Sequence, residues 1–243
     1  MPVALVTGAS LGLGRALATE LVARGWSLVV DGRRANLLDD LVRELEPSSV
    51  TALPGDVADP AHRSALRAAV QRHGRLDLLV NNASNLGPSP LPHLRHYPLD
   101  QLAAVYQVDV LAPLALIQLH HGLLAASAGT VVNITSDAGV EAYAGWGGYG
   151  SAKAALDQAS AVLAVEEPAL AVYAFDPGDM QTEMHQQAFP GEDISDRPRP
   201  QSVVPALLAL IERRPASGRY RARDLPVNTD PKVIDTNGAE VSR

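Results

Sequence analysis

Short apolar runs rich in β-branched residues alternate with longer segments rich in Ala and Leu along most of the chain. The short runs have the length and composition of buried strands, and the longer segments carry apolar positions at helical spacing. The pattern predicts strands over residues 3–7, 27–31, 50–53, 76–81, 130–135, 171–175 and 219–222. It predicts helices over residues 12–24, 36–46, 60–73, 99–108, 111–126, 149–166 and 201–213. We therefore expect a single doubly wound α/β domain with a seven-stranded, mainly parallel sheet covered by helices on both faces.

Two segments fall outside this alternation. Residues 177–200 lack clear periodicity, and a loop of that length in a compact domain is usually a lid or binding loop. Residues 226–243 are polar and are interpreted as a loosely held C-terminal tail. The predicted domain therefore spans residues 1–225, with its ligand loop at about 177–200.

Composition narrows the class of protein further. The chain of 243 residues is long enough for one α/β domain and short for two. Its net charge is −7, and no basic cluster suits a nucleic-acid backbone, so we expect no nucleic-acid partner. The absence of cysteine fits a reducing cytoplasm. The first predicted strand begins at Val3, which leaves no room for a signal peptide, and no apolar stretch reaches the roughly 20 residues that span a bilayer. We expect a cytoplasmic protein without a membrane partner.

A Gly-rich turn joins the first predicted strand to the first predicted helix. Gly8 permits a tight turn, and Gly12 and Gly14 allow close packing of the chain and the helix. The helix N-terminus offers free N–H groups and the positive end of its dipole to a pyrophosphate. A plain strand–helix turn is the alternative. The strand–turn–helix context favours a dinucleotide site.

Tyr149 and Lys153 are four residues apart in a predicted helix, so they share one face. A nearby ammonium favours the phenolate and lowers the pKa of a tyrosine toward working pH, where a proton-transfer catalyst is most effective. Ser136, which follows an apolar strand, can hydrogen-bond a substrate carbonyl oxygen. Without such context, Tyr149 would be a surface aromatic and Lys153 a solvated charge. We interpret the three residues as a candidate catalytic group.

These motifs occur in an order and at distances that resemble the short-chain dehydrogenase/reductase family over roughly residues 3–222. The Asn81-Asn82-Ala83 run between them belongs to the same resemblance. It implies a Rossmann-type fold and hydride transfer between a nicotinamide cofactor and a small-molecule carbonyl or alcohol, with Tyr149 as proton donor or acceptor. It also implies a homodimer or homotetramer, paired through the long helices that begin near Leu111 and Tyr149.

The resemblance assigns the site residue by residue. The implied catalytic residues are Ser136, Tyr149, Lys153 and Asp109. The implied cofactor-binding residues are Gly8, Ser10, Leu11, Gly12, Leu13, Gly14, Arg33, Arg34, Asp56, Val57, Asn82, Ala83, Ser84, Tyr149, Lys153, Pro177, Gly178, Met180 and Thr182. The expected substrate-pocket residues are Asp137, Ala138, Tyr143, Trp146, Met184, His185 and Phe189.

The choice between NAD and NADP depends on the residues after the second strand. In NAD-preferring relatives an acidic residue binds the ribose hydroxyls, and that position falls here on Gly32, one residue after Asp31. Arg33 suits a 2′-phosphate, with support from Ser10 and Arg34. We predict that NADP(H) is favoured over NAD(H). A register slip of one residue would place Asp31 on the ribose and reverse the preference.

Two positions depart from the family pattern. Ser84 stands where Gly is usual, and Asp109 stands where an Asn usually holds a water that links the lysine to a proton relay. A carboxylate buried near Lys153 would stabilise the ammonium and weaken its effect on Tyr149. The alternative is that Asp109 caps a helix before Leu111.

The leading hypothesis is therefore an NADPH-dependent reductase of ketones or aldehydes, or the reverse alcohol dehydrogenase. One alternative is a nucleotide-binding protein of the same fold without redox turnover, acting as a sensor or scaffold. Another is a non-redox cyclase or epimerase. Glycines 145, 147 and 148 indicate open volume for a bulky or ring-containing ketone, or serve a turn. His120 and His121 have no acidic partner at metal spacing, so we expect no metal.

Overall fold

The computed structural model describes residues 1–226, so the predicted tail from residue 227 onward lies outside the described residues. Its strands form one seven-stranded sheet in the order β3-β2-β1-β4-β5-β6-β7. Every neighbouring pair is parallel. The strands are β1 (Val3–Val6), β2 (Ser27–Gly32), β3 (Val50–Pro54), β4 (Leu78–Asn81), β5 (Thr130–Ile134), β6 (Ala171–Asp176) and β7 (Gly218–Arg221). The prediction of a doubly wound, seven-stranded α/β domain is confirmed.

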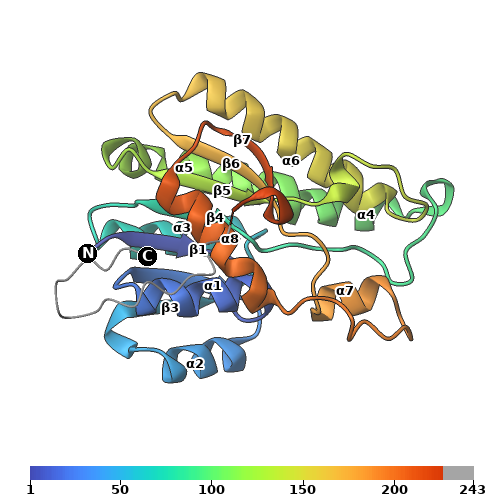
Figure 1. Cartoon of the computed structure of the whole chain (residues 1–243), viewed down its shortest axis with the longest axis horizontal. Helices are drawn as coiled ribbons and strands as arrows, with labels where there is room; N and C mark the ends of the chain where they lie inside the picture. Colours follow the sequence, from blue (N-terminus) through green and yellow to red (C-terminus); the bar gives the residue numbers. More distant parts are fainter. Residues whose placement is uncertain (227–243) are drawn as a thin grey trace, which may run out of the picture.

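Helices cover both faces of this sheet (Figure 1). They are α1 (Gly12–Ala23), α2 (Ala35–Glu44), α3 (Pro60–Gln71), α4 (Leu99–Tyr106), α5 (Ala112–Ala126), α6 (Gly147–Glu166), α7 (Glu183–Ala188) and α8 (Pro200–Arg213). Successive strand residues supply opposite cores, as in β1, where Val6 packs with α1, α2 and α8 and Leu5 packs with α3 and α5. The sheet is therefore buried on both faces, which explains why its strands have continuous apolar runs.

The strand order reverses between β1 and β4. The chain winds outward through β2 and β3 on one side of this point and through β5, β6 and β7 on the other. In open parallel sheets, a crevice forms at such a point beside the carboxyl ends of the strands, because the flanking loops diverge there. The turns after β1, β4 and β5, which carry the predicted motifs, all lie at this edge.

The segment predicted as a loop over residues 177–200 contains the short helix α7, so that part of the prediction is wrong. Thr182 caps α7, its side-chain oxygen accepting a hydrogen bond from the His185 N–H at 3.1 Å. A helix of six residues is too short to give a periodic signal. In Figure 1, α7 stands apart from the two helix layers, at the carboxyl edge of the sheet.

The two helices predicted over residues 99–108 and 111–126 form one continuous helix of 28 residues, Leu99–Ala126. The π-helical segment Gln107–Leu111 joins α4 to α5 without a break. This helix is long and apolar enough to cross a membrane by length and composition alone, with mean hydropathy 1.7 and 39% of its most apolar window buried. The expectation that no apolar segment reaches that length is therefore corrected. A core helix of a soluble protein has the same length and composition.

Candidate active site

A cleft of about 810 Å³ opens at the carboxyl ends of the central strands. This volume lies within the ordinary range of small-molecule sites. Turns after β1, β2, β4, β5 and β6 line the cleft together with α7. All predicted site residues line it except Gly14 and Asp109, which are buried behind its wall. Sequence reasoning missed Leu86, Gln187 and Ala188, which also line it. Ala188 lies four residues after the predicted site residue Met184, and this spacing was the one signal available.

The Gly-rich turn leaves room for a ligand at the N-terminus of α1. Gly8 and Gly12 both have positive φ, at 65° and 58°, which glycine adopts without strain. A Cβ on Gly8 would lie 2.8 Å from the Ala83 Cα, so only glycine allows this close approach. Leu11, the N-cap residue of α1, makes no side-chain cap hydrogen bond, and the first turn carries no acidic residue. The free N–H groups and the helix dipole therefore fit the pyrophosphate of a dinucleotide.

Asp31 at the end of β2 faces the Gly-rich turn and helix α3. Its Oδ1 accepts a hydrogen bond from the Gly8 N–H at 2.7 Å, and its Oδ2 lies 3.1 Å from Nε2 of His62. Both carboxylate oxygens are thus engaged inside the protein, and the residue is 1% exposed. At the next position, a Cβ on Gly32 would meet the Ser10 hydroxyl at 2.9 Å. The contact with His62 was not predicted, because the two residues are 31 positions apart in the chain.

The two arginines after β2 differ in their partners. Arg33 lines the cleft and makes no hydrogen bond or ion pair with residues 1–226. Arg34 pairs with Glu183 at 2.7 Å, which connects the start of α2 to the start of α7. Both side chains of that pair are about half exposed, so the contact contributes little stability and a bound anion can displace it.

Tyr149 and Lys153 lie together on α6, as the spacing predicted. The Lys153 ammonium is 5.3 Å from the centre of the Tyr149 ring. It donates to the Ile134 carbonyl oxygen at 3.0 Å and pairs with Oδ1 of Asp109 at 2.9 Å. Lys153 is 2% exposed and Asp109 is fully buried. Because an ammonium has three donors, these contacts leave one N–H of Lys153 for a ligand.

Asp109 lies inside the π-helical segment, and its carboxylate points at Lys153 rather than at a helix N-terminus. The helix-cap alternative for Asp109 is therefore wrong. Its Oδ2 accepts from the Asn85 N–H at 3.0 Å, and its Oδ1 also accepts from the Ser84 hydroxyl. Ser84 and Asp109, the two positions that depart from the family pattern, thus contact each other.

The pKa of Tyr149 is raised above its ordinary value, whereas the pairing with Lys153 alone predicted a fall. Burial is the largest cause and raises it; Lys153 opposes the rise, and the Asp109 charge adds to it. For Lys153, burial is the largest cause and lowers the pKa, but Asp109 and Tyr149 together outweigh it and the pKa is raised. Lys153 therefore stays charged beside a tyrosine that holds its proton.

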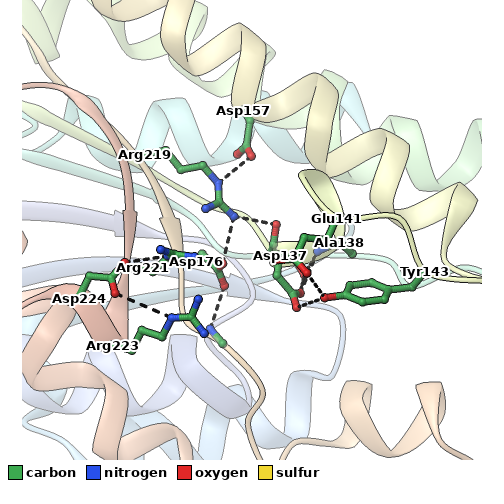
Figure 2. A network of polar contacts seen from close by, with 12 residues as sticks. Asp137, Ala138, Glu141, Tyr143, Asp157, Asp176, Arg219, Arg221, Arg223 and Asp224 are labelled. Atoms are coloured by element: carbon green, nitrogen blue, oxygen red, sulfur yellow. Dashed lines mark hydrogen bonds and ion pairs between the residues drawn. The ribbon is translucent and has the colours of Figure 1, made fainter.

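Arg219 of β7 anchors the turn that carries Ser136. Figure 2 shows the Arg219 guanidinium between Asp157 and Asp176. The Ser136 hydroxyl donates to Oδ1 of Asp137 at 3.0 Å, and the Ser136 carbonyl oxygen accepts from Arg219 at 3.0 Å. Arg219 also pairs with Asp176 at 3.0 Å and with Asp157 at 3.1 Å. This guanidinium ties the Ser136 turn to β6 and α6. Sequence reasoning missed it, since Arg219 lies 83 residues from Ser136.

Aromatic side chains form the wall of the cleft beyond Tyr149. The Trp146 ring lies 5.8 Å from the Tyr149 ring and 6.0 Å from the Phe189 ring, centre to centre. The His185 ring of α7 lies 4.9 Å from the Phe189 ring, tilted by 41°. At the rim, the Tyr143 hydroxyl reaches the carboxylates of Asp137 at 3.1 Å and Glu141 at 2.9 Å (Figure 2). The wall is therefore aromatic and its rim acidic.

The glycines before Tyr149 do not leave the open volume that the sequence indicated. A Cβ on Gly145 would touch Leu91, and Cβ atoms on Gly147 and Gly148 would overlap Leu94 and Tyr97. The segment between β4 and α4 fills the space beside these glycines. The interpretation of open substrate volume is wrong, and the glycines serve close packing of that segment.

No group of three or more His, Cys, Asp or Glu side chains within residues 1–226 is placed to hold a metal ion. The uncapped turn after β1, the reversal of strand order and the Tyr149–Lys153 pair define a class, the dinucleotide-binding α/β proteins with a proton-transfer group beside the ligand cleft.

Comparison with known proteins places the chain within that class. Residues 2–193 match the short chain dehydrogenase family. Sepiapterin reductase of Mus musculus is 35% identical over 204 residues, which is 76% of this chain and 77% of that enzyme. The benzil reductase ((S)-benzoin forming) of Saccharomyces cerevisiae is 32% identical, covering 95% of this chain and 86% of the yeast enzyme.

Solved structures of short chain dehydrogenases also resemble this chain. A short chain dehydrogenase from Salmonella enterica has a TM-score of 0.85 at 28% identity, over 91% of this chain and 96% of that one. A short chain dehydrogenase from Shigella flexneri complexed with NADP has a TM-score of 0.84 at 28% identity, over 91% and 97% of the two chains. The chain belongs to the short-chain dehydrogenase/reductase family, and it is an NAD(P)-dependent oxidoreductase.

Proposed function

We propose that this protein reduces a ketone or aldehyde to an alcohol with NADPH, and catalyses the reverse oxidation when the cofactor ratio favours it. The observation that carries the proposal is that Ser136, Tyr149 and Lys153 line the same cleft as the uncapped Gly-rich turn. A dinucleotide on that turn extends toward the Tyr149 end of the cleft, where a substrate carbonyl has hydrogen-bond donors.

In this mechanism the bound cofactor supplies a hydride to the carbonyl carbon. The Ser136 hydroxyl turns from Asp137 to the carbonyl oxygen, which the Tyr149 hydroxyl also holds. Tyr149 passes its proton to that oxygen as negative charge develops there. Lys153 stabilises the resulting phenolate through its fixed ammonium, and its remaining N–H binds the nicotinamide ribose. Asp109 holds the ammonium in place by the 2.9 Å ion pair. The products are the alcohol, the oxidised cofactor and a tyrosinate that recovers a proton from solvent.

We assign the remaining cleft residues to different parts of the cofactor according to their position in the cleft. We assign Asp56 and Val57 to the adenine end and Asn82, Ala83 and Ser84 to the adenosine ribose. Residues 177–182 are assigned to the nicotinamide carboxamide, because they lie between the Gly-rich turn and α7. A Cβ on Gly12 would lie 3.6 Å from the Thr182 methyl group, which supports that placement.

The preference for NADPH over NADH rests on three features of the β2 end. Asp31 directs its two oxygens at Gly8 and His62 and is 1% exposed, which disfavours contact with ribose hydroxyls. Ser10 fills the space that an acidic side chain at residue 32 would need. Arg33 lines the cleft without a partner among the described residues, and it is a bidentate donor suited to a phosphate. A short chain dehydrogenase with NADP bound, 28% identical, is consistent with this preference.

We propose a ring-bearing ketone as substrate. The rings of Trp146, Tyr149 and Phe189 supply apolar faces on which a planar group can stack. Two relatives named for their substrates, benzil reductase and sepiapterin reductase, act on ring-bearing compounds. Ala138, Tyr143, Met184 and His185 complete the pocket, and Asp137 offers a hydrogen-bond acceptor at its rim.

We further propose a homodimer or homotetramer in the cytoplasm. The continuous helix Leu99–Ala126 is only partly buried, and α6 exposes Val162 (43%) and Val165 (82%). A second copy of the chain would cover these apolar positions.

A screen of cofactor oxidation tests the proposal. Purified protein is mixed with NADPH, and in parallel with NADH, and with a panel of ketones and aldehydes that includes benzil and sepiapterin. Turnover with NADPH on a ring-bearing ketone supports the proposal. Tight cofactor binding without turnover on any compound would favour a nucleotide-binding sensor or a non-redox enzyme instead.

A further inference from the structure

Ser84, which lines the cleft, contacts Asp109, which is buried behind it and lies 25 residues away in the sequence. Ser84 follows β4 and Asp109 lies in the π-helical segment between α4 and α5. The Ser84 hydroxyl donates to Oδ1 of Asp109. Each residue is a departure from the family pattern, and each is the other's partner.

The contacts of Asp109 use both oxygens of its side chain as acceptors. Its two oxygens receive Lys153, Ser84 and the Asn85 N–H, all of them donors. A carboxylate accepts at both oxygens, whereas an amide would turn its NH₂ group toward one of these donors. The asparagine usual in relatives therefore does not satisfy this set of contacts. The local structure fits aspartate only.

Ser84 and Tyr149 line the same cleft. The Ser84 hydroxyl favours the phenolate form of Tyr149 and opposes the rise in the pKa of Tyr149 that burial causes. A serine has one hydroxyl hydrogen to donate. While Tyr149 is protonated, it can donate to Ser84 and Ser84 can donate to Asp109. Once Tyr149 has lost its proton, its oxygen competes with Asp109 for the same hydrogen.

On the basis of the proposed function, we propose that Ser84 is a positioning residue that couples Tyr149 to the Asp109–Lys153 ion pair. Its hydroxyl hydrogen is given to Asp109 when Tyr149 is neutral and turns to the phenolate oxygen when Tyr149 has delivered its proton. Asp109 is then held by Lys153 and Asn85 alone. No atom is gained or lost in this exchange.

The charged and titratable groups around this unit come from several elements. Those that act on Tyr149, Lys153 or Asp109 are Asp157 of α6, Asp176 of β6 and Tyr97 of the segment before α4. Asp157 and Asp176 are both paired with Arg219. Substitutions at Ser84 and Asp109 leave Asp157, Asp176 and Tyr97 in place. A change in the titration of Tyr149 then reports on the contacts among Ser84, Asp109 and Lys153.

The two substitutions act on Tyr149 in opposite directions. Ser84→Ala removes a donor to the phenolate, so the pH midpoint of alcohol oxidation, which needs the phenolate, should rise by about one unit. Asp109→Asn removes a negative charge, so the midpoint should fall by about one unit. In the Asp109→Asn background the Ser84 hydrogen is held less tightly, and Ser84→Ala should then raise the midpoint by more than it does alone.

The experiment is a double-variant cycle of Ser84→Ala and Asp109→Asn, read as the pH profile of alcohol oxidation with saturating cofactor. Ser84→Thr, which keeps the hydroxyl, should restore the wild-type midpoint. Asp100→Asn removes an exposed charge from the same long helix and is the matched control. If Asp109→Asn fails to fold, Ser84→Ala and Ser84→Thr still test the proposal. The midpoint should rise when the Ser84 hydroxyl is removed and should stay at the wild-type value when it is kept.

A second readout separates this proposal from the proposed function. Tyrosine labelled with ¹³C at Cζ reports the ionisation of Tyr149 by NMR without substrate, with Tyr149→Phe to assign the resonance. Opposite, non-additive shifts support the coupling. Shifts that simply add, or a fall in activity with an unchanged midpoint, overturn it. Absence of turnover in the wild type counts against the proposed function alone.

Discussion

The guanidinium of Arg219, on the last strand, donates a hydrogen bond to the carbonyl oxygen of Ser136 at 3.0 Å. The same group pairs with Asp176 and Asp157, which are 4% and 14% exposed at their side chains. Strand β7 is at the edge of the sheet, yet it fixes the turn that presents the proposed carbonyl-binding hydroxyl.

Arg219→Ala should therefore affect both stability and catalysis. Two largely buried carboxylates would lose their cation, and the expected loss in free energy of unfolding is about 1–3 kcal/mol. Loosening of the Ser136 turn should also raise KM for the carbonyl substrate. Urea denaturation and steady-state kinetics measure the two effects. Arg223→Ala is the control, because that side chain is 73% exposed. Equal free energies of unfolding and equal KM values in the two variants would contradict the anchoring role of Arg219.

Tyr149→Phe should abolish nearly all turnover, by about 10²–10⁴-fold, while cofactor binding persists, because only the transferable proton is lost. Lys153→Ala should reduce both turnover and cofactor binding, since its free N–H is assigned to the ribose. Steady-state kinetics measure turnover, and a fluorescence titration with the cofactor measures binding. Tyr106→Phe, on α4 and outside the cleft, serves as the control. Wild-type turnover in Tyr149→Phe would place the proton donor elsewhere.

Arg33→Ala should weaken NADPH binding about 10- to 100-fold, because a charge-assisted contact to a phosphate is worth roughly 1.5–3 kcal/mol. NADH binding should change little. Arg34 can share the phosphate contact once its ion pair with Glu183 opens, so the double variant with Arg34→Ala should lose more. Dissociation constants for both cofactors test this, with Arg72→Ala, exposed at the end of α3, as the control. A wild type that prefers NADH would reverse the cofactor assignment.

His120 makes stability depend on pH. Burial is the largest cause and lowers the pKa of this histidine in α5 below its ordinary value near 6.5. The unfolded chain then binds a proton that the folded chain does not, so stability falls as the pH drops below about 6.5. His120→Gln should lose less stability over the same interval. Urea denaturation midpoints measured at several pH values from about 7.5 down to about 5 test this. The exposed His73, substituted in the same way, should leave the profile unchanged.

Assembly is tested by light scattering at micromolar concentration, where we expect a dimer or tetramer. Val165 is 82% exposed on α6 and Leu111 is 48% exposed on the long helix. A charge at either position, as in Val165→Asp, would place a carboxylate in the proposed apolar interface and should produce monomers. Leu94→Asp, at an exposed position beside Gly147, is the control. A wild-type monomer would contradict the assembly proposal.

The order of strands and helices could be predicted from the sequence because local periodicity reflects which face of each element is buried. The pairing of Tyr149 with Lys153 was predictable for a related reason, since helical geometry brings residues four apart together. The boundaries of the strands agreed within a few residues. Short α7 escaped detection, and the π-helical junction was divided into two helices, because neither feature has a periodicity of its own.

The chain's own pattern thus determined the doubly wound sheet, the Gly-rich turn and the Tyr149–Lys153 pair, all of which depend on neighbours in sequence. Only the tertiary structure decided that Asp109 pairs with Lys153 and Ser84, that Arg219 supports Ser136, and that Leu94 and Tyr97 fill the space beside the glycines. These contacts join residues from different elements, and their geometry follows from how the helices and loops pack against the sheet. Side-chain identity alone carries no record of that packing, because the same residue can be a cap, a solvated charge or a buried partner according to what surrounds it.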